Sequence, residues 1–218
     1  MMTRLVRRAG WTIVMVLSVG VALFSYRYLT WSGPLAPNVV ANPYARPWLP
    51  IHAGAAAAAL LVGAFQLLPR LRARVPGVHR WAGRLYVLGC LVGGVSGFVL
   101  ALGSTAGPIA TAGFGTLALF WFYATVRAWQ FAMAGRFAEH RAWMIRSWAL
   151  TLAAVSLRLY LPLAQAMAFD LAASYRAISW LCWTGNLALA ELWLAGALRR
   201  TPRAGSVDSP VAPTPLAT

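Results

Sequence analysis

Residues 51–68 read IHAGAAAAALLVGAFQLL and contain no charged residue. A helix that spans a bilayer crosses about 30 Å of hydrocarbon, which takes about 20 mostly apolar residues. A helix suits this role because it satisfies its own backbone hydrogen bonds. Five other stretches have the same character, namely Trp11 to Leu29, Gly83 to Leu102, Ile109 to Met133, Trp143 to Met167 and Ala177 to Leu198. The sequence therefore predicts an all-α polytopic membrane protein, a bundle of six transmembrane helices within residues 1–198.

The composition of the 218 residues supports the same fold class. The chain is 60% hydrophobic and 11% charged, whereas soluble domains are about 45–50% apolar and about 25% charged. The mean hydropathy is +0.64. Cys90 and Cys182 both lie in apolar stretches, so we interpret them as small buried side chains and expect no disulfide framework. These values exclude an ordinary water-soluble domain.

The charge is carried almost entirely by arginine. The net charge is +15, and all nineteen basic residues are Arg. Fifteen of them precede the first apolar stretch, lie within 69–84 or 127–146, or follow residue 198. Short cytoplasmic loops carry a positive excess, so this pattern predicts a multi-pass membrane protein with both termini in the cytoplasm. Separate clusters beside membrane spans favour anionic lipids, and not nucleic acid, as the partner.

The two ends of the chain have distinct predicted roles. Three arginines precede the first apolar stretch, as in a signal peptide, but no A-x-A-like cleavage site follows, so we expect a retained first helix. Residues 199–218 are rich in Pro, Ser, Thr and Ala and are predicted to form a disordered cytoplasmic tail. The connector over 30–50 contains five prolines and is predicted to be an extended strap.

Small residues recur at every fourth position on two consecutive stretches. They are Ala55, Ala59 and Gly63 on one stretch and Gly89, Gly93 and Gly97 on the next. Small side chains let helix backbones approach closely, and close packing drives helix association in lipid. We therefore predict a tight hairpin between these two helices. The alternative is that the glycines make room for a flat cofactor.

Two of the three histidines occur in similar local sequences. Residues 79–86 read HRWAGRLY and residues 139–147 read EHRAWMIRS, so an arginine follows each histidine directly and another follows within two turns. This similarity suggests that the second and third helices repeat as the fourth and fifth. With VSLRLY at 155–160, the motifs closely resemble the bacterial predicted-membrane-protein family called domain of unknown function 2306.

The resemblance covers about residues 43–165 and includes IHAG at 51–54 and GAFQ at 63–66. It implies a multi-span inner-membrane protein and brings no established activity. A function therefore has to be argued from individual residues.

The paired histidines suggest a haem site. His79 and His140 precede predicted helices, where the helix dipole disfavours the imidazolium, and neutral imidazole is the form that ligates metals. If the two face each other, they could be the axial ligands of one haem b in an electron-transfer protein. The arginines expected to pair with the propionates are Arg80, Arg84, Arg141 and Arg146. The alternative is that both histidines only bond headgroups and loop carbonyls.

Three charged residues are predicted to lie deep in the membrane, where charges are costly. Glu191 and Arg127 are each about 10 Å from the end of their helix at 1.5 Å per residue, so they form either an ion pair or a site for protons or substrate. Arg158 lies about 27 Å along its helix from His140, near the outer face. Its possible partners there are Asp170, carbonyls of the strap, or an anionic ligand beside His52.

Three functions follow from these residues. The first is electron transfer through a haem held by His79 and His140. The second is a non-catalytic role as an assembly partner, with another membrane protein or as a homo-oligomer. The third is a carrier for a small anion or other solute that enters past His52 and Arg158. The sequence contains no phosphate-binding loop or zinc-protease motif, and whether the protein is an enzyme stays open.

Overall fold

The structure is a computed structural model of the chain and describes residues 2–66 and 68–200. Within these ranges every regular element is a helix, which confirms the all-α prediction. The elements are α1 (Met2–Ser25), η1 (Tyr26–Tyr28), α2 (Pro37–Val40), α3 (Ala45–Gln66), α4 (Pro69–Arg74), α5 (Pro76–Leu102), α6 (Pro108–Met133), α7 (Phe137–Thr151), α8 (Ala153–Ala166) and α9 (Leu171–Arg200). From residue 201 onward, the predicted tail lies outside the described residues.

Five helical stretches of the described chain are long and apolar enough to cross a membrane. They are Ala9–Tyr28, Ala45–Gln66, Pro76–Leu102, Pro108–Met133 and Phe137–Ala166. This confirms a polytopic membrane protein. The sixth predicted span falls in α9, which has 30 residues but is not among the five. Asn186 and Glu191 interrupt the apolar character of α9.

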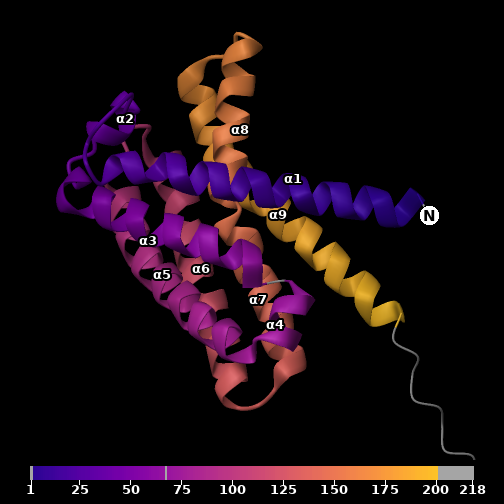
Figure 1. The fold of residues 1–218 in the computed structure, drawn as a ribbon. Coiled ribbons are helices and arrows are strands. Elements are labelled where there is room, and N and C mark those ends of the chain that lie inside the picture. The colour runs from indigo at the N-terminus through magenta and orange to yellow at the C-terminus, as the bar shows by residue number, and fades with distance from the viewer. Residues whose placement is uncertain (1, 67, 201–218) are drawn as a thin grey trace, which may run out of the picture.

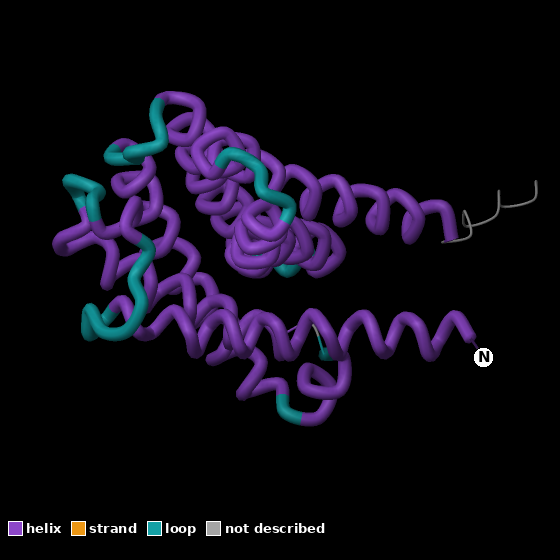
Figure 2. Tube along the Cα trace, turned by 90° about the horizontal axis from the view of Figure 1, so that it is seen from above, coloured by secondary structure: helices purple, strands orange, loops and turns teal. Residues whose placement is uncertain are grey.

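The long helices form a bundle in which chain neighbours pack together. α3 packs against α5, α5 against α6 and α6 against α7, while α8 pairs with α9. Figure 1 shows α1 crossing this group, and in Figures 1 and 2 its N-terminal part projects beyond the other helices. We call residues 29–44, between η1 and α3, the strap. The strap bonds the last turn of α5, since Asn42 Nδ2 donates to Leu100 O at 2.7 Å, and we call this end of the bundle the strap end.

Prolines set the beginnings of several helices. Pro37, Pro69, Pro76 and Pro108 occupy the first turn of α2, α4, α5 and α6. Proline fits there because the first N–H groups of a helix have no intrahelical acceptor. The prediction of a fully extended strap over 30–50 is therefore wrong. Pro37 begins the short helix α2, and the regular part of α3 already begins after Arg46, which is itself extended.

The predicted tight hairpin of small residues is confirmed. α3 and α5 pack along their lengths, and a Cβ atom placed on Gly89 would lie 2.8 Å from the Ala55 carbonyl oxygen and 3.1 Å from Ala59 Cβ. A Cβ on Gly93 would lie 2.9 Å from the Trp121 ring. The glycines therefore allow close approach of both α3 and α6 to α5.

The fifth predicted helix, Trp143 to Met167, is broken in the structure. α7 ends at Thr151 and α8 begins at Ala153. Asn186 of α9 binds both sides of the break, because its Nδ2 donates to Ala149 O at 3.2 Å and its Oδ1 accepts from Ser156 Oγ at 3.0 Å. A helix break in lipid requires such partners for the backbone groups it leaves unpaired.

A buried hydrogen-bond network joins α5, α6 and α7. The Tyr86 hydroxyl is 2.9 Å from Ser147 Oγ and 3.0 Å from Thr151 Oγ1. Trp121 Nε1 donates to Thr151 Oγ1 at 2.9 Å, and Thr125 Oγ1 is 2.7 Å from Ser147 Oγ. All five side chains are buried. The network fixes the registers of three helices, because each polar group in the core needs its partner.

Candidate functional site

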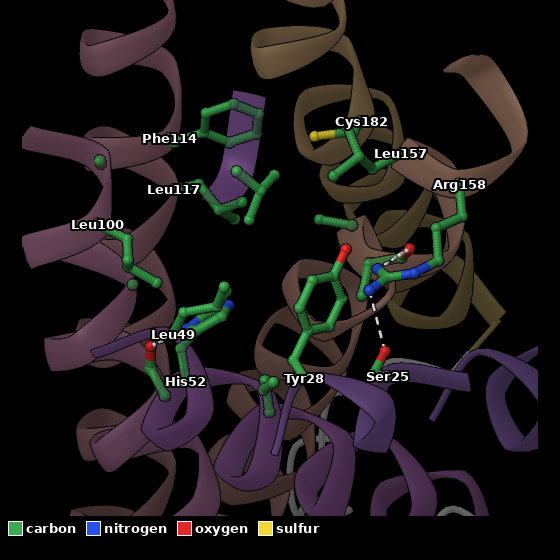
Figure 3. A pocket seen from close by; sticks show the side chains of 18 of the residues that line it. Ser25, Tyr28, Leu49, His52, Leu100, Phe114, Leu117, Leu157, Arg158 and Cys182 are labelled. Atoms are coloured by element: carbon green, nitrogen blue, oxygen red, sulfur yellow. Dashed lines mark hydrogen bonds between the residues drawn. The ribbon is translucent and has the colours of Figure 1, made fainter. Parts of the chain in front are cut away.

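A cavity of about 380 Å³ lies beneath the strap. It lies within the size range of small-molecule sites, about 300–1,000 Å³. α3, α5 and α6 line it, together with the end of α1, η1, the strap, α8 and α9. Figure 3 shows its interior, with side chains from helices that are far apart in the sequence. His52 and Arg158, which the sequence predicts at one membrane face, both line this cavity.

Arg158 lines the cavity from α8. Its Nη1 donates to Ala154 O at 3.0 Å and its Nη2 donates to Ser25 Oγ at 2.9 Å. Ser25 Oγ in turn donates to Val21 O at 2.7 Å, so its lone pairs are directed at the guanidinium. Figure 3 shows the contact between Arg158 and Ser25. A guanidinium has five N–H groups, and these two bonds leave three for another acceptor.

His52 lines the cavity from α3, and Figure 3 shows Tyr28 between it and Arg158. His52 Nδ1 is 2.9 Å from Gly93 O. A carbonyl oxygen only accepts, so Nδ1 carries the proton and the neutral ring keeps a lone pair on Nε2. The absence of a side chain at Gly97 makes room for the ring, since a Cβ there would lie 2.9 Å from His52 Cε1.

A second cation, Arg27, also lines the cavity. Its guanidinium carbon lies 3.7 Å from the centroid of the Phe24 ring, and its Nη2 donates to Tyr28 Oη at 3.3 Å. Its Nε is buried and has no hydrogen-bond partner within the described chain. A buried N–H group without an acceptor costs free energy.

The carboxylates of the described residues are all engaged elsewhere. They are Glu139, 2.6 Å from Arg136 Nη2; Asp170, whose Oδ1 accepts from Ala173 N at 2.7 Å; and Glu191, which pairs with Arg146. Asp170 is therefore not the partner of Arg158, because it caps the first turn of α9 instead. Neither Arg158 nor Arg27 has a carboxylate counterion in the part of the chain that the structure describes.

The predicted ion pair between Glu191 and Arg127 is wrong. Glu191 instead forms a bidentate pair with Arg146, at 2.5 Å for Nε to Oε1 and 2.9 Å for Nη2 to Oε2. Arg127 lies over the rings of Phe131 and Trp143, at 4.7 and 5.9 Å. Depth along a helix predicts the layer of a residue but not the side of the helix on which it lies. Arg146 of α7, and not Arg127 of α6, is the arginine that reaches Glu191 of α9.

The two histidines of the predicted haem site lie in one layer of the bundle. His79 lies seven residues before Tyr86, and His140 lies seven residues before Ser147. The side chains of Tyr86 and Ser147 are in contact. Both histidines are therefore about 10 Å along their helices from that contact. His140 Nδ1 is 2.9 Å from Ala128 O. Neither histidine lines the cavity at the strap end.

The arginines near these histidines have varied surroundings. Arg146 is in the ion pair with Glu191. Arg84 lies over the Trp81 ring at 4.8 Å and Arg141 lies over the Trp193 ring at 5.6 Å. Arg80 is exposed. Arg146 also lies over the Trp143 ring at 4.9 Å. A propionate at this end would compete with one ion pair and three aromatic contacts.

Sequence reasoning missed several residues of the cavity. Ser25 orients Arg158, Tyr28 lies between the two predicted site residues, and Arg27 adds a second cation. In the sequence, Arg27 is only one of the four arginines outside the clusters that are predicted to be cytoplasmic. Nothing in the local sequence indicates that the end of the first helix meets α8, more than a hundred residues away.

A family of known sequences matches the part of the chain that contains His52 and Arg158. No curated protein and no solved structure matches the chain. The family model described as "Predicted membrane protein (DUF2306)" matches residues 49–194. The match runs from α3 into α9 and includes both His52 and Arg158. The resemblance noted from the paired His-Arg motifs is confirmed, and the chain belongs to this DUF2306 family of predicted membrane proteins.

Proposed function

We propose that the protein is a membrane carrier that binds a small anion in the cavity at the strap end. The observation that carries the proposal is Arg158, a cation that lines the cavity with three N–H groups available and without a described carboxylate partner. An unpaired charge in a low-dielectric interior is strongly destabilising. A bound anion would supply the missing counter-charge.

Two further features support this proposal. Arg27 adds a second cation to the same cavity, with one buried N–H that lacks an acceptor within the described residues. The break between α7 and α8 also borders the cavity, since Thr151 and Ala153 both line it. Discontinuous helices line the substrate sites of many secondary transporters, where they allow one part of the bundle to move against the other.

The test is ligand-dependent thermal unfolding of the purified full chain in phosphatidylcholine nanodiscs. Chloride, phosphate, acetate, benzoate and decanoate are added separately. A ligand at a hundred times its Kd stabilises the native state by about 2.7 kcal/mol. We expect at least one anion to raise the Tm of the wild type and not that of Arg158→Gln. Arg46→Gln is the control, because Arg46 lies over Trp31 at 4.7 Å and does not line the cavity. Equal stabilisation of Arg158→Gln and wild type, or no stabilisation by any anion, would refute the proposal.

A b-type haem held by His79 and His140 is the second candidate. One observation favours it: His140 Nδ1 lies 2.9 Å from the Ala128 carbonyl oxygen, so Nδ1 carries a proton and Nε2 is the nitrogen that would ligate a metal. Metal-ligating histidines are commonly oriented by such a bond from the other ring nitrogen. Protein from haem-replete cells should then show a Soret band that shifts on reduction and is lost in His79→Ala and His140→Ala but kept in His52→Ala. A colourless wild type excludes the haem, and failure of both tests would leave a non-catalytic assembly partner.

A further inference from the structure

We infer that the anion taken by the strap-end cavity is an amphiphile, an acidic head group on an apolar body of about a dozen carbon atoms. The inference rests on the proposed function, since it presupposes that an anion binds there. It adds to that proposal the chemical class of the anion. Three properties of the cavity carry it: its volume, the distribution of its polar and apolar walls, and the sign of its charges.

The volume of the cavity is too large for an inorganic anion alone. A dry cavity of about 150 Å³ accommodates benzene, which has six carbons. On the same scale, the 380 Å³ of this cavity holds about fifteen non-hydrogen atoms. Phosphate or sulfate has five and would leave most of the apolar lining without contacts. An acid of ten to twelve carbons has the matching size.

The walls of the cavity differ in polarity. Figure 3 shows Ser25, Tyr28 and the guanidinium of Arg158 close together, while Phe114 and Leu117 lie on the other side of the cavity. Leu157 and Cys182 lie beside Arg158, and Leu49 lies beside His52. The lining also includes Leu60, Ala57 and Leu150, all buried apolar residues. A hydrated ion would lose its water against such a wall without compensation. An amphiphile places its head against the polar side and its body against the apolar side.

The charges of the lining select the sign of the head group. The described lining contains Arg158 and Arg27 and no Asp or Glu. A cationic or zwitterionic head would therefore bring a positive charge without a partner. A neutral head would leave Arg158 uncompensated. A carboxylate, or an oxyanion of similar size, matches the free N–H groups of a guanidinium and can accept two of them at once.

The test measures equilibrium binding of radiolabelled ligands to the full chain in phosphatidylcholine nanodiscs, with empty nanodiscs subtracted. The ligands are acetate, hexanoate, decanoate, decanol and decyltrimethylammonium. Each methylene should tighten binding by about fourfold, equivalent to about 0.8 kcal/mol, so decanoate should bind about 200-fold more tightly than hexanoate. Decanol, which lacks the charge, should bind at least about tenfold more weakly than decanoate, and decyltrimethylammonium should show no saturable binding.

A matched pair of variants tests the apolar wall separately. Leu117→Asn changes the cavity lining, whereas Leu119→Asn places the same side chain on the exposed face of α6, where Leu119 is 58% exposed. We expect Leu117→Asn to weaken decanoate binding about tenfold or more with little effect on acetate, and Leu119→Asn to leave both unchanged. If Leu117→Asn does not fold, the ligand series on the wild type still decides whether the bound anion is an amphiphile.

The outcomes separate this inference from the proposed function. If acetate and hexanoate bind as tightly as decanoate, the amphiphile is wrong and the anion site stands. If decanol binds as tightly as decanoate, the charge is irrelevant and both the inference and the proposed function fall. Loss of saturable decanoate binding in Arg158→Gln, with retention in Arg46→Gln, supports both.

Discussion

Replacing Gly89 with alanine tests the close approach of α3 and α5. The new Cβ would lie 2.8 Å from the Ala55 carbonyl oxygen and 3.1 Å from Ala59 Cβ. The nearer atom belongs to the backbone of α3, so it cannot turn aside as the end of a side chain can. The two helices must therefore move apart at this level, or the methyl group must stay in a contact that is too short.

The size of the effect follows from these distances. Carbon–oxygen contacts in helix packing are normally about 3.3 Å or longer, so relief at Gly89 requires a shift of about 0.5 Å. Overpacking of this kind costs about 1–3 kcal/mol. Alanine itself favours the helix over glycine by about 0.5–1 kcal/mol. The net expectation is a loss of up to about 2.5 kcal/mol in the free energy of unfolding.

The measurement is reversible unfolding in mixed micelles with increasing dodecyl sulfate, followed by far-UV circular dichroism. Gly185→Ala in α9 is the control, because no atom lies within 4 Å of the position of its Cβ. We expect Gly185→Ala to be as stable as the wild type or more stable, whereas Gly89→Ala unfolds at lower detergent fraction. If both variants shift in the same stabilising direction, the packing argument for α3 and α5 is refuted.

Three other substitutions test the core contacts by the same unfolding assay. Tyr86→Phe removes a hydroxyl that bonds two buried side chains and should cost about 0.5–1.5 kcal/mol; an unchanged midpoint would mean that the network does not hold the helices. A double-mutant cycle of Arg146→Ala and Glu191→Gln should give a coupling of about 0.5–1 kcal/mol, because both side chains are partly exposed; a cycle of Glu191→Gln with Arg127→Ala should give none. Asn186→Leu leaves the break between α7 and α8 without two bonds and should cost about 1–3 kcal/mol; wild-type stability would show that the break needs no partner.

The fold class and the main packing contact could be predicted from the sequence because both are local. Length and apolar content predict which stretches span a membrane, and small residues at every fourth position predicted the α3–α5 hairpin. The break after Thr151 could not be predicted, because no proline or glycine marks it in the sequence between residues 143 and 160. Its stabilisation depends on Asn186, which lies in another helix.

The candidate site could be predicted only in part, for a related reason. Spacing along the helices placed His52 and Arg158 near one membrane face, and they do line one cavity. Spacing alone also favoured Arg127 as the partner of Glu191, and that was wrong because the direction of a side chain around its helix depends on how the helices pack. Ser25 and Arg27 complete the cavity from the end of α1, a contact that only the tertiary structure creates.

The surroundings of the partly buried arginines explain why the strap end is the stronger candidate. Arg27 lies over Phe24, Arg127 lies over Phe131, and Arg146 is paired with Glu191. Each of these three cations has an aromatic face or a carboxylate that offsets its charge. Among the partly buried arginines of the described chain, Arg158 has neither, and its hydrogen bonds go to one carbonyl and one hydroxyl. The charge of each of the other three is offset in this way, whereas Arg158 faces a cavity, and this is the electrostatics of an anion site.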